Sequence, residues 1–446
     1  MIKYSDIFKL AVPSIIANIT TPLLSLVDTA IAGHLGSPVY LAAIAVGGSM
    51  FNMIYYLFAF LRMGTSGLTA QSYGAEDKSG INSALSRSLV FALLFATAII
   101  LFQYVIGKIG MFILDPDEET QKYALKYFRI LIYGAPAVLM NYSICGWLIG
   151  MQRARDTMII SIVVNTVNIG ASFMFVYLFS MQIEGIATGT LIAQWSGVAA
   201  GLIYVRKNGF SFDGFGKTFR SLFKRQGEKE NVNVNIFLRT LCIVAVTVWF
   251  TSSGASQGAV MLAVNSLLMQ FFILFSYFMD GFAYAAEALA GKFYGAKDYR
   301  NLKNTVVKLL KIGAVMALAY TLIYFLCGDL FIRLLSDEEE VRKLAVDYKY
   351  WALTIPFAGF AAFIMDGVFV GMTKTRQMLF SLLFSGLVFY IIWLLLTPVM
   401  GNHGLWLAFV AYLLCRGLYL LYKIKKEEIL INKILLLPLQ QTDKKD

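Results

Sequence analysis

Charged side chains are scarce in this 446-residue chain. Asp, Glu, Lys and Arg make up 15% of the residues, whereas soluble globular proteins contain about 25%. None occurs in 240–279 or in 377–415, and Asp28 is the only one between Lys9 and Arg62. Because a helix that crosses a membrane needs roughly 20 apolar residues, this distribution excludes an ordinary soluble fold and predicts membrane-spanning helices.

Cysteine and histidine are also rare. The four cysteines lie within apolar runs, where we expect small core residues rather than disulfides or metal ligands: Cys145, Cys242, Cys327 and Cys415. The two histidines, His34 and His403, stand singly beside glycines. We therefore expect no metal and no cofactor. None of the usual catalytic signatures is present, so we do not expect an enzyme.

The apolar runs predict an all-α membrane protein with twelve helices. The first run is too long for a cleavable signal peptide, and it carries Asp28. The predicted helices lie near 8–33, 41–72, 84–109, 122–150, 157–180, 184–206, 233–256, 259–291, 302–327, 343–371, 376–399 and 404–423.

The net charge of +11 is unevenly distributed. Segments 206–239 and 292–311 contain eight and six Lys or Arg residues, and both fall on one side of the predicted membrane. By the positive-inside rule this side is cytoplasmic, together with both termini. Because the basic residues lie in short loops between spans, they do not indicate nucleic-acid binding.

The sequence repeats itself at a spacing of 221 residues. Tyr73-Gly74-Ala75 returns as Tyr294-Gly295-Ala296, and Gly150-Met151 returns as Gly371-Met372 (295 − 74 and 371 − 150). The acidic run 117–119 also falls on 338–340. A constant register over this length indicates two copies of one structural unit, which in a membrane protein is typical of a transporter that binds its cargo between the halves.

The repeat predicts the domain organisation. Six helices per half is an even number, so both halves enter the membrane from the same side and form parallel repeats. We expect an N-terminal bundle over 1–206, a cytoplasmic linker over 207–232, a C-terminal bundle over 233–424 and a cytoplasmic tail over 425–446.

Asp28 is the strongest candidate for a functional residue. A carboxylate within a span costs on the order of 3 kcal/mol and is functional by default. The second half has Trp249 at the equivalent position (28 + 221), so folding of the repeat does not require the acid. Pro22 on the same helix removes a backbone hydrogen bond and predicts a bend. The alternative is a buried structural acid that is hydrogen-bonded to neutral groups.

Polar residues on the fifth and sixth predicted helices are candidate partners. Asn165, Asn168 and Ser172 share one helix face, and Thr190 and Gln194 share another. Such stripes face the interior of a membrane bundle. They either coordinate a cation or hold the helices together.

The second half contains three further candidate acids. Asp366 is matched by Cys145 in the first half (145 + 221), so it is not required by the repeat. Asp280 and Glu287 lie seven residues apart and share a helix face. We expect these acids to contact cargo, and a structural network near the cytoplasmic end is the alternative.

Four segments of the sequence carry recognisable motifs: 13–36 around Val27-Asp28-Thr29-Ala30, 62–71 with Arg62-Met63-Gly64-Thr65, 279–296 with Met279-Asp280-Gly281 and Tyr294-Gly295-Ala296, and 366–371 with Asp366-Gly367. Together they resemble the multidrug and toxic compound extrusion (MATE) family, in particular its DinF-like branch. The resemblance covers nearly the whole chain.

The resemblance implies a V-shaped pair of six-helix bundles in a bacterial inner membrane. It also implies a monomer that exports cationic or amphiphilic drugs in exchange for inward H⁺ or Na⁺. The resemblance further implies that Asp28 binds the coupling ion and that Asn168 and Thr190 belong to the same polar cluster. Some members carry a second carboxylate where this chain has Ser172, and this departure favours H⁺ over Na⁺. The alternatives are a flippase for lipid-linked precursors from the same superfamily and, from a different class, a polytopic membrane enzyme.

Overall fold

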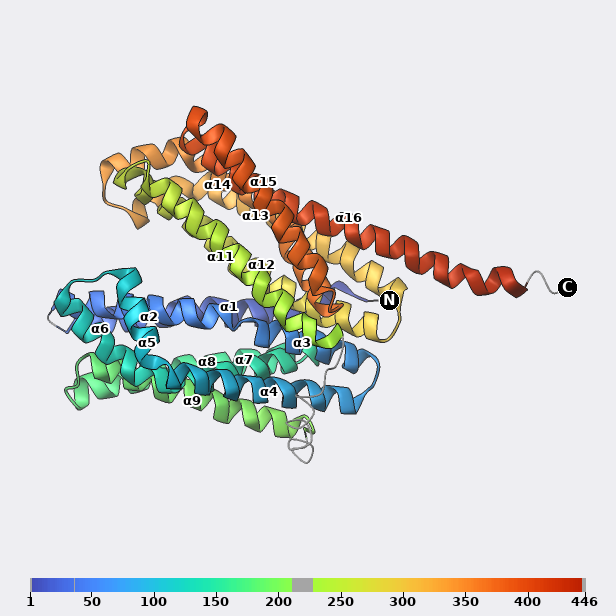
Figure 1. Cartoon of the computed structure of the whole chain (residues 1–446), viewed down its shortest axis with the longest axis horizontal. Helices are drawn as coiled ribbons and strands as arrows, with labels where there is room; N and C mark the ends of the chain where they lie inside the picture. The colour runs from blue at the N-terminus through green and yellow to red at the C-terminus, as the bar shows by residue number, and fades with distance from the viewer. Residues whose placement is uncertain (1, 36, 211–227, 443–446) are drawn as a thin grey trace.

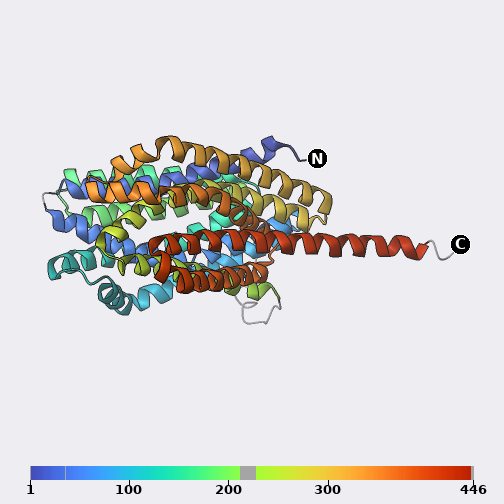
Figure 2. The ribbon, with the colours of Figure 1, turned by 90° about the horizontal axis from the view of Figure 1, so that it is seen from above.

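The structure is a computed structural model that describes residues 2–35, 37–210 and 228–442, and within these ranges it contains helices and turns but no β-strand. Figure 1 shows an N-terminal and a C-terminal bundle that meet at one end and diverge toward the other, as the arms of a V. In Figure 2 the helices of both bundles run along one long axis, and α16 extends beyond the others. The predicted all-α fold with two bundles is confirmed.

The N-terminal bundle contains α1 (Tyr4–Gly33), α2 (Pro38–Leu57), α3 (Phe60–Gly74), α4 (Lys78–Leu101), α5 (Gln103–Leu114), α6 (Glu118–Leu131), the 3-10 turn η1 (Ile132–Gly134), α7 (Ala135–Gly150), α8 (Ala154–Phe173), the π-helical turn η2 (Met174–Leu178) and α9 (Ile183–Lys207). The C-terminal bundle contains α11 (Glu228–Ala255), α12 (Ala259–Gly295), α13 (Tyr299–Leu335), α14 (Glu339–Gly371), α15 (Thr375–Met400) and α16 (Asn402–Thr442).

The helices have the length and composition of membrane spans. Within the described residues, eleven helical stretches are long and apolar enough to cross a membrane. The 30-residue helix α1 is additional to these, in agreement with the twelve predicted helices. The four cysteines are free and only partly buried, so they lie at the edge of the core rather than in it.

Four of the predicted helices are interrupted in the structure, one of them over 157–180, where α8 ends at Phe173 and η2 follows. The helix expected over 41–72 is divided into α2 and α3, and the one over 84–109 into α4 and α5. The helix expected over 122–150 is divided by η1, after which Pro136 stands in the first turn of α7. Because proline has no N–H, it fits the start of a helix better than its interior.

Two predicted connecting segments differ from the described helices. Residues 211–227 of the expected 207–232 linker lie outside the described residues, and α11 already begins at Glu228. The expected tail over 425–446 is helical as far as Thr442, because α16 continues without a break.

The 221-residue repeat is visible in the backbone. Four pairs of helix boundaries differ by this spacing: Gly74 and Gly295, Lys78 and Tyr299, Gly150 and Gly371, and Ala154 and Thr375. The side chain of Asp77 caps α4 by accepting from Gly80 N at 2.9 Å, and Asp298 caps α13 by accepting from Asn301 N at 3.0 Å. The two halves therefore repeat in local structure as well as in sequence.

The repeated glycines explain how the two bundles meet. A Cβ atom on Gly74 of α3 would collide with the carbonyl oxygen of Lys292 on α12, and one on Gly295 would collide with that of Gln71 on α3. The two contacts are related by the repeat (292 − 71 and 295 − 74). Gln71 also donates from its side-chain amide to Thr373 Oγ1 at 2.9 Å. We call this α3–α12 contact the bundle crossing; it lies at the end of the molecule where the N-terminus and the far end of α16 are found (Figure 1).

Candidate functional site

Asp28 lies inside the N-terminal bundle, near the end of α1. Its side chain is 7% exposed, and Thr190 Oγ1 on α9 lies 3.3 Å from its Oδ2. Asn168 Nδ2 on α8 donates to the same hydroxyl at 2.8 Å. The structure thus brings together three of the residues that the sequence indicated, from three different helices. We call Asp28, Asn168, Ser172 and Thr190 the Asp28 cluster.

The cluster has unused hydrogen-bonding capacity. Asp28 Oδ1, Asn168 Oδ1 and Ser172 Oγ are buried, and none has a hydrogen-bond partner among the described residues. Asn168 and Ser172 are fully buried. Buried polar atoms are normally satisfied, so these three oxygens are positions at which a proton or a cation would gain contacts.

Close packing of α8 and α9 brings the cluster together. A Cβ atom on Gly189 would lie 2.6 Å from the backbone nitrogen of Ser172, so only glycine permits this approach. Asn165, on the same side of α8, donates to the carbonyl oxygen of Thr20 on α1 at 3.2 Å. Thr20 lies two residues before Pro22, which stands within α1. Asn165 therefore links α8 to the proline-containing part of α1.

Tyr127 is a member of this neighbourhood that the sequence did not indicate. Its buried side chain lies within electrostatic range of Asp28 and interacts with Thr190. A Cβ atom on Gly47 of α2 would lie 2.6 Å from the ring of Tyr127, so the ring occupies space that glycine leaves. Aromatic residues are abundant throughout this chain, and no sequence signal separated Tyr127 from the others.

Gln194 is not linked to the cluster by any hydrogen bond between described residues. Its Oε1 is buried without a partner and lies where a Cβ atom on Gly134 would be. Its backbone carbonyl accepts from Asn141 Nδ2 at 3.2 Å. The side chain of Gln194 thus lies against η1, and its backbone contacts α7.

Asp366 on α14 is paired with two arginines. Arg239 on α11 and Arg416 on α16 both donate from Nη2 to Asp366 Oδ2, and the arginines are 8% and 6% exposed. A buried ion pair needs good geometry to offset the loss of hydration. The sequence did not suggest Arg239 as a partner, because it ends a basic segment that is also explained by the positive-inside rule.

A second buried ion pair joins the two bundles. Arg62 Nη1 on α3 lies 3.5 Å from Glu287 Oε2 on α12, and its guanidinium lies 4.0 Å from the centre of the Tyr284 ring. Asp280, also on α12, is partly exposed and lies within electrostatic range of Arg62, Arg239 and Arg416. The three second-half acids therefore share one region with three arginines, and the formal charges of the six side chains cancel.

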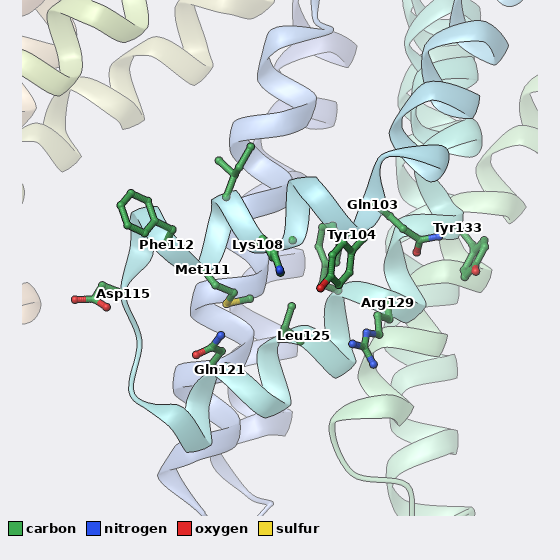
Figure 3. A pocket seen from close by; sticks show the side chains of 13 residues that line it. Gln103, Tyr104, Lys108, Met111, Phe112, Asp115, Gln121, Leu125, Arg129 and Tyr133 are labelled. Atoms are coloured by element: carbon green, nitrogen blue, oxygen red, sulfur yellow. The ribbon is translucent and has the colours of Figure 1, made fainter.

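The pocket shown in Figure 3 is separate from all of these residues. It has a volume of about 1090 Å³ and is formed by α5, α6 and η1, with Lys108, Arg129 and Asp115 among its lining side chains. None of the predicted site residues lines it. In the described part of the chain, no group of three His, Cys, Asp or Glu residues has the geometry of a metal site.

The fold and the repeat define a membrane transporter, and the chain belongs to the MatE family. The model of this family matches residues 13–174 and again residues 234–395, a spacing of 221 residues (234 − 13 and 395 − 174). Members are multidrug and toxic compound efflux transporters, which confirms that the chain is not an enzyme.

The DNA damage-inducible protein F of Escherichia coli is a similar protein. It is 36% identical over 419 residues, which cover 93% of this chain and 90% of the relative. A probable multidrug resistance protein NorM of Shewanella oneidensis is 23% identical, with 94% of each chain covered. A solved structure described as the outward-facing conformation of a multidrug resistance MATE family transporter superposes with a TM-score of 0.85. It is 20% identical, and 95% of this chain and 96% of that chain are covered. The expected resemblance to the MATE family and its DinF-like branch is confirmed.

Proposed function

We propose that this protein exports organic cations or other amphiphiles from the bacterial cytoplasm in exchange for inward protons, and that Asp28 carries the proton. The observation that supports this role most directly is the environment of Asp28. Its hydrogen-bonding neighbours, Thr190 and Asn168, are neutral, and its Oδ1 has no partner among the described residues. A buried acid without a cationic partner gains from binding a proton.

Asp366 provides the contrast. Its Oδ2 accepts from Arg239 and Arg416, so its charge is already compensated within the protein. Protonation of Asp366 would leave two buried arginines without their carboxylate, which is costly. We therefore assign ion coupling to Asp28 and propose that Asp366 supports the cargo path and gating of the second bundle.

Asp280 is the second-half acid best suited to contact a cationic cargo. It is partly exposed, and no hydrogen bond to its side chain is found among the described residues. Glu287 is 1% exposed and paired with Arg62. Tyr284 adds an aromatic ring to the proposed cargo path. Gln194 is also a proposed cargo residue, although its unsatisfied amide oxygen is buried against Gly134 in the first bundle.

Sodium is the alternative coupling ion. The unsatisfied oxygens of Asp28, Asn168 and Ser172 would be its ligands, but only one of them is a carboxylate. A sodium ion must replace its hydration shell with several oxygens, whereas a proton requires a single carboxylate. The Asp28 cluster therefore favours the proton.

The charge balance around the second-half acids favours drug export over lipid-precursor flipping. A flippase for lipid-linked precursors would need a strongly basic cavity. Here the three arginines at 62, 239 and 416 are matched by the acids at 280, 287 and 366. This neutral cluster would not attract a polyanionic precursor.

We further propose that both termini face the cytoplasm and that the protein acts as a monomer. The basic segments 206–239 and 292–311 support this topology. With this orientation the bundle crossing closes the cytoplasmic end, so the conformation described is outward-facing (Figure 1).

Efflux of a fluorescent organic cation from cells tests the role of Asp28. We expect Asp28→Asn to lower efflux to the background level while the protein is expressed normally, because the amide binds no proton. Asp115→Asn is the matched control. Asp115 is exposed and has the left-handed backbone conformation (φ 42°) that asparagine tolerates. Wild-type efflux by well-expressed Asp28→Asn would refute the proposal.

A further inference from the structure

The pocket of Figure 3 lies between α5, α6 and η1, in the first bundle. This part of the bundle is at the end of the molecule far from both termini (Figure 1). The volume of about 1090 Å³ is at the upper end of the range for small-molecule sites, about 300–1,000 Å³. The pocket therefore has room for a large ligand and is too wide to hold a single ion.

The break between α4 and α5 creates this pocket. In the second half the corresponding helix, α13, is continuous, whereas the first-half helix is divided at Phe102. Gln103 stands at the repeat position of Tyr324 (324 − 103). Tyr324 is buried and donates from its hydroxyl to Phe271 O at 2.7 Å, whereas Gln103 has no ring and lines the pocket. The pocket is thus a feature of the first half that the repeat does not require.

Two basic side chains line the pocket, Lys108 and Arg129. Neither forms an ion pair with another described residue. Lys108 Nζ lies 4.8 Å from the centre of the Tyr104 ring, a contact that leaves its charge uncompensated. In the second half Asp329 stands at the position of Lys108 (329 − 108) and accepts from Lys349 Nζ at 2.7 Å. The first half therefore has unpaired positive charge where the second half has an ion pair.

Asp115 is the only acidic side chain among the described residues that line the pocket. Figure 3 shows it at the side of the pocket far from Arg129, with its carboxylate pointing away from both basic side chains. The described residues include no ion pair between Asp115 and either of them. Asp115 is therefore not part of the basic surface and does not neutralise it.

The rest of the pocket wall is largely apolar. Ile109 and Phe112 of α5 are exposed, and Leu125 of α6 lines the same pocket. The exposed ring of Tyr133 stands at its edge, and aromatic side chains with a polar tip are typical of the membrane–water interface. The pocket thus combines a basic part with an apolar wall, as the two parts of a phospholipid require.

We propose that this pocket binds an anionic phospholipid of the surrounding membrane. The phosphate accepts hydrogen bonds from Lys108 and Arg129, and one acyl chain lies along Ile109 and Phe112. A guanidinium matches the geometry of phosphate oxygens, and a lysine adds a point charge. Each basic residue near a lipid headgroup contributes roughly a fivefold gain in affinity. The inference requires only that the chain spans a membrane, and it does not depend on the transported cargo.

Native mass spectrometry of the delipidated full-length protein tests the charge requirement. Palmitoyl-oleoyl phosphatidylglycerol is titrated in detergent, and the bound lipid is counted. We expect one tightly retained lipid, and an affinity at least about tenfold lower in the double variant Lys108→Gln, Arg129→Gln. The matched control is Lys122→Gln, Arg333→Gln, which removes the same charge from exposed positions outside the pocket, and we expect less than about a twofold change.

A second pair of variants tests the apolar wall without altering charge. Ile109→Trp adds a large ring inside the pocket and should prevent lipid retention. Ile113→Trp places the same ring one turn further along α5, at an exposed position that does not line the pocket, and it should have no effect.

Three results would overturn the proposal. One is an equal loss of affinity in the two charge variants, and another is equal retention of phosphatidylcholine. The third is binding of inorganic phosphate at Lys108 and Arg129 while Ile109→Trp leaves lipid binding unchanged, which would identify an anion site without a lipid.

Discussion

The bundle crossing predicts how a single methyl group shifts the conformational equilibrium. In Gly295→Ala the new Cβ atom would collide with the carbonyl oxygen of Gln71, and in Gly74→Ala with that of Lys292. Both obstacles are backbone atoms, so no side-chain rotation relieves them. Overpacking of this kind costs about 1–3 kcal/mol. The bundle crossing exists only in the conformation that is closed at the end carrying the termini. The steric cost therefore destabilises that closed conformation and does not affect the conformation that is open at the same end.

That cost corresponds to a roughly 5- to 150-fold shift toward the alternative conformation. Alanine is also a better helix former than glycine by about 1 kcal/mol, but this gain applies to both conformations and cancels between them. We therefore expect a change in conformational populations without loss of folded protein.

Double electron–electron resonance measures the shift. In a variant without native cysteines, spin labels at Glu119→Cys and Glu340→Cys report the separation of the bundles at the end opposite the bundle crossing. These positions are exposed and related by the repeat. Gly295→Ala should increase the short-distance population, whereas Gly48→Ala, where a Cβ atom meets nothing within 4 Å, should not. An unchanged distance distribution in folded Gly295→Ala would refute the argument.

Three further predictions concern the site and the topology. Thr190→Val should abolish coupled efflux, and Thr190→Ser should retain it, because the hydroxyl joins Asn168 to Asp28; equal efflux by the two variants would contradict this role. Asp366→Asn should lower the free energy of unfolding in detergent by about 3–5 kcal/mol, because Arg239 and Arg416 lose their carboxylate. Some pH-driven transport should persist in this variant. Loss of transport of every cargo would instead place Asp366 in ion coupling. In intact cells an impermeant maleimide should label Glu119→Cys but not Arg300→Cys, and the reverse pattern would overturn the topology.

The sequence predicted the repeat and the members of the Asp28 cluster for physical reasons. Identical motifs at constant spacing require equivalent backbone positions, and the caps at Asp77 and Asp298 have that equivalence. An isolated acid in an apolar run must find polar neighbours. The hydroxyl of Thr190 and the amide of Asn168 are those neighbours in the structure.

Other features could not be predicted because their signals have ordinary explanations. Arg239 ends a basic segment that the positive-inside rule already explains, so the sequence gives no signal that it pairs with Asp366 inside the bundle. The break between α4 and α5 at Phe102 falls within a continuous apolar run that contains no proline or charge. Phe210 lies just beyond a helix end, where sequence alone does not show that the chain folds back onto Trp147.

Efflux from proteoliposomes under separate ion gradients tests the central claim most directly. The vesicles are loaded with a fluorescent organic cation, and either a pH gradient or a Na⁺ gradient is imposed at zero membrane potential. The Na⁺ arm has no pH difference and contains a protonophore. We predict efflux driven by the pH gradient in the wild-type protein, none in Asp28→Asn, and none driven by Na⁺ in either. Strong Na⁺-driven efflux by the wild-type protein would show that sodium, and not the proton, is the ion that Asp28 carries.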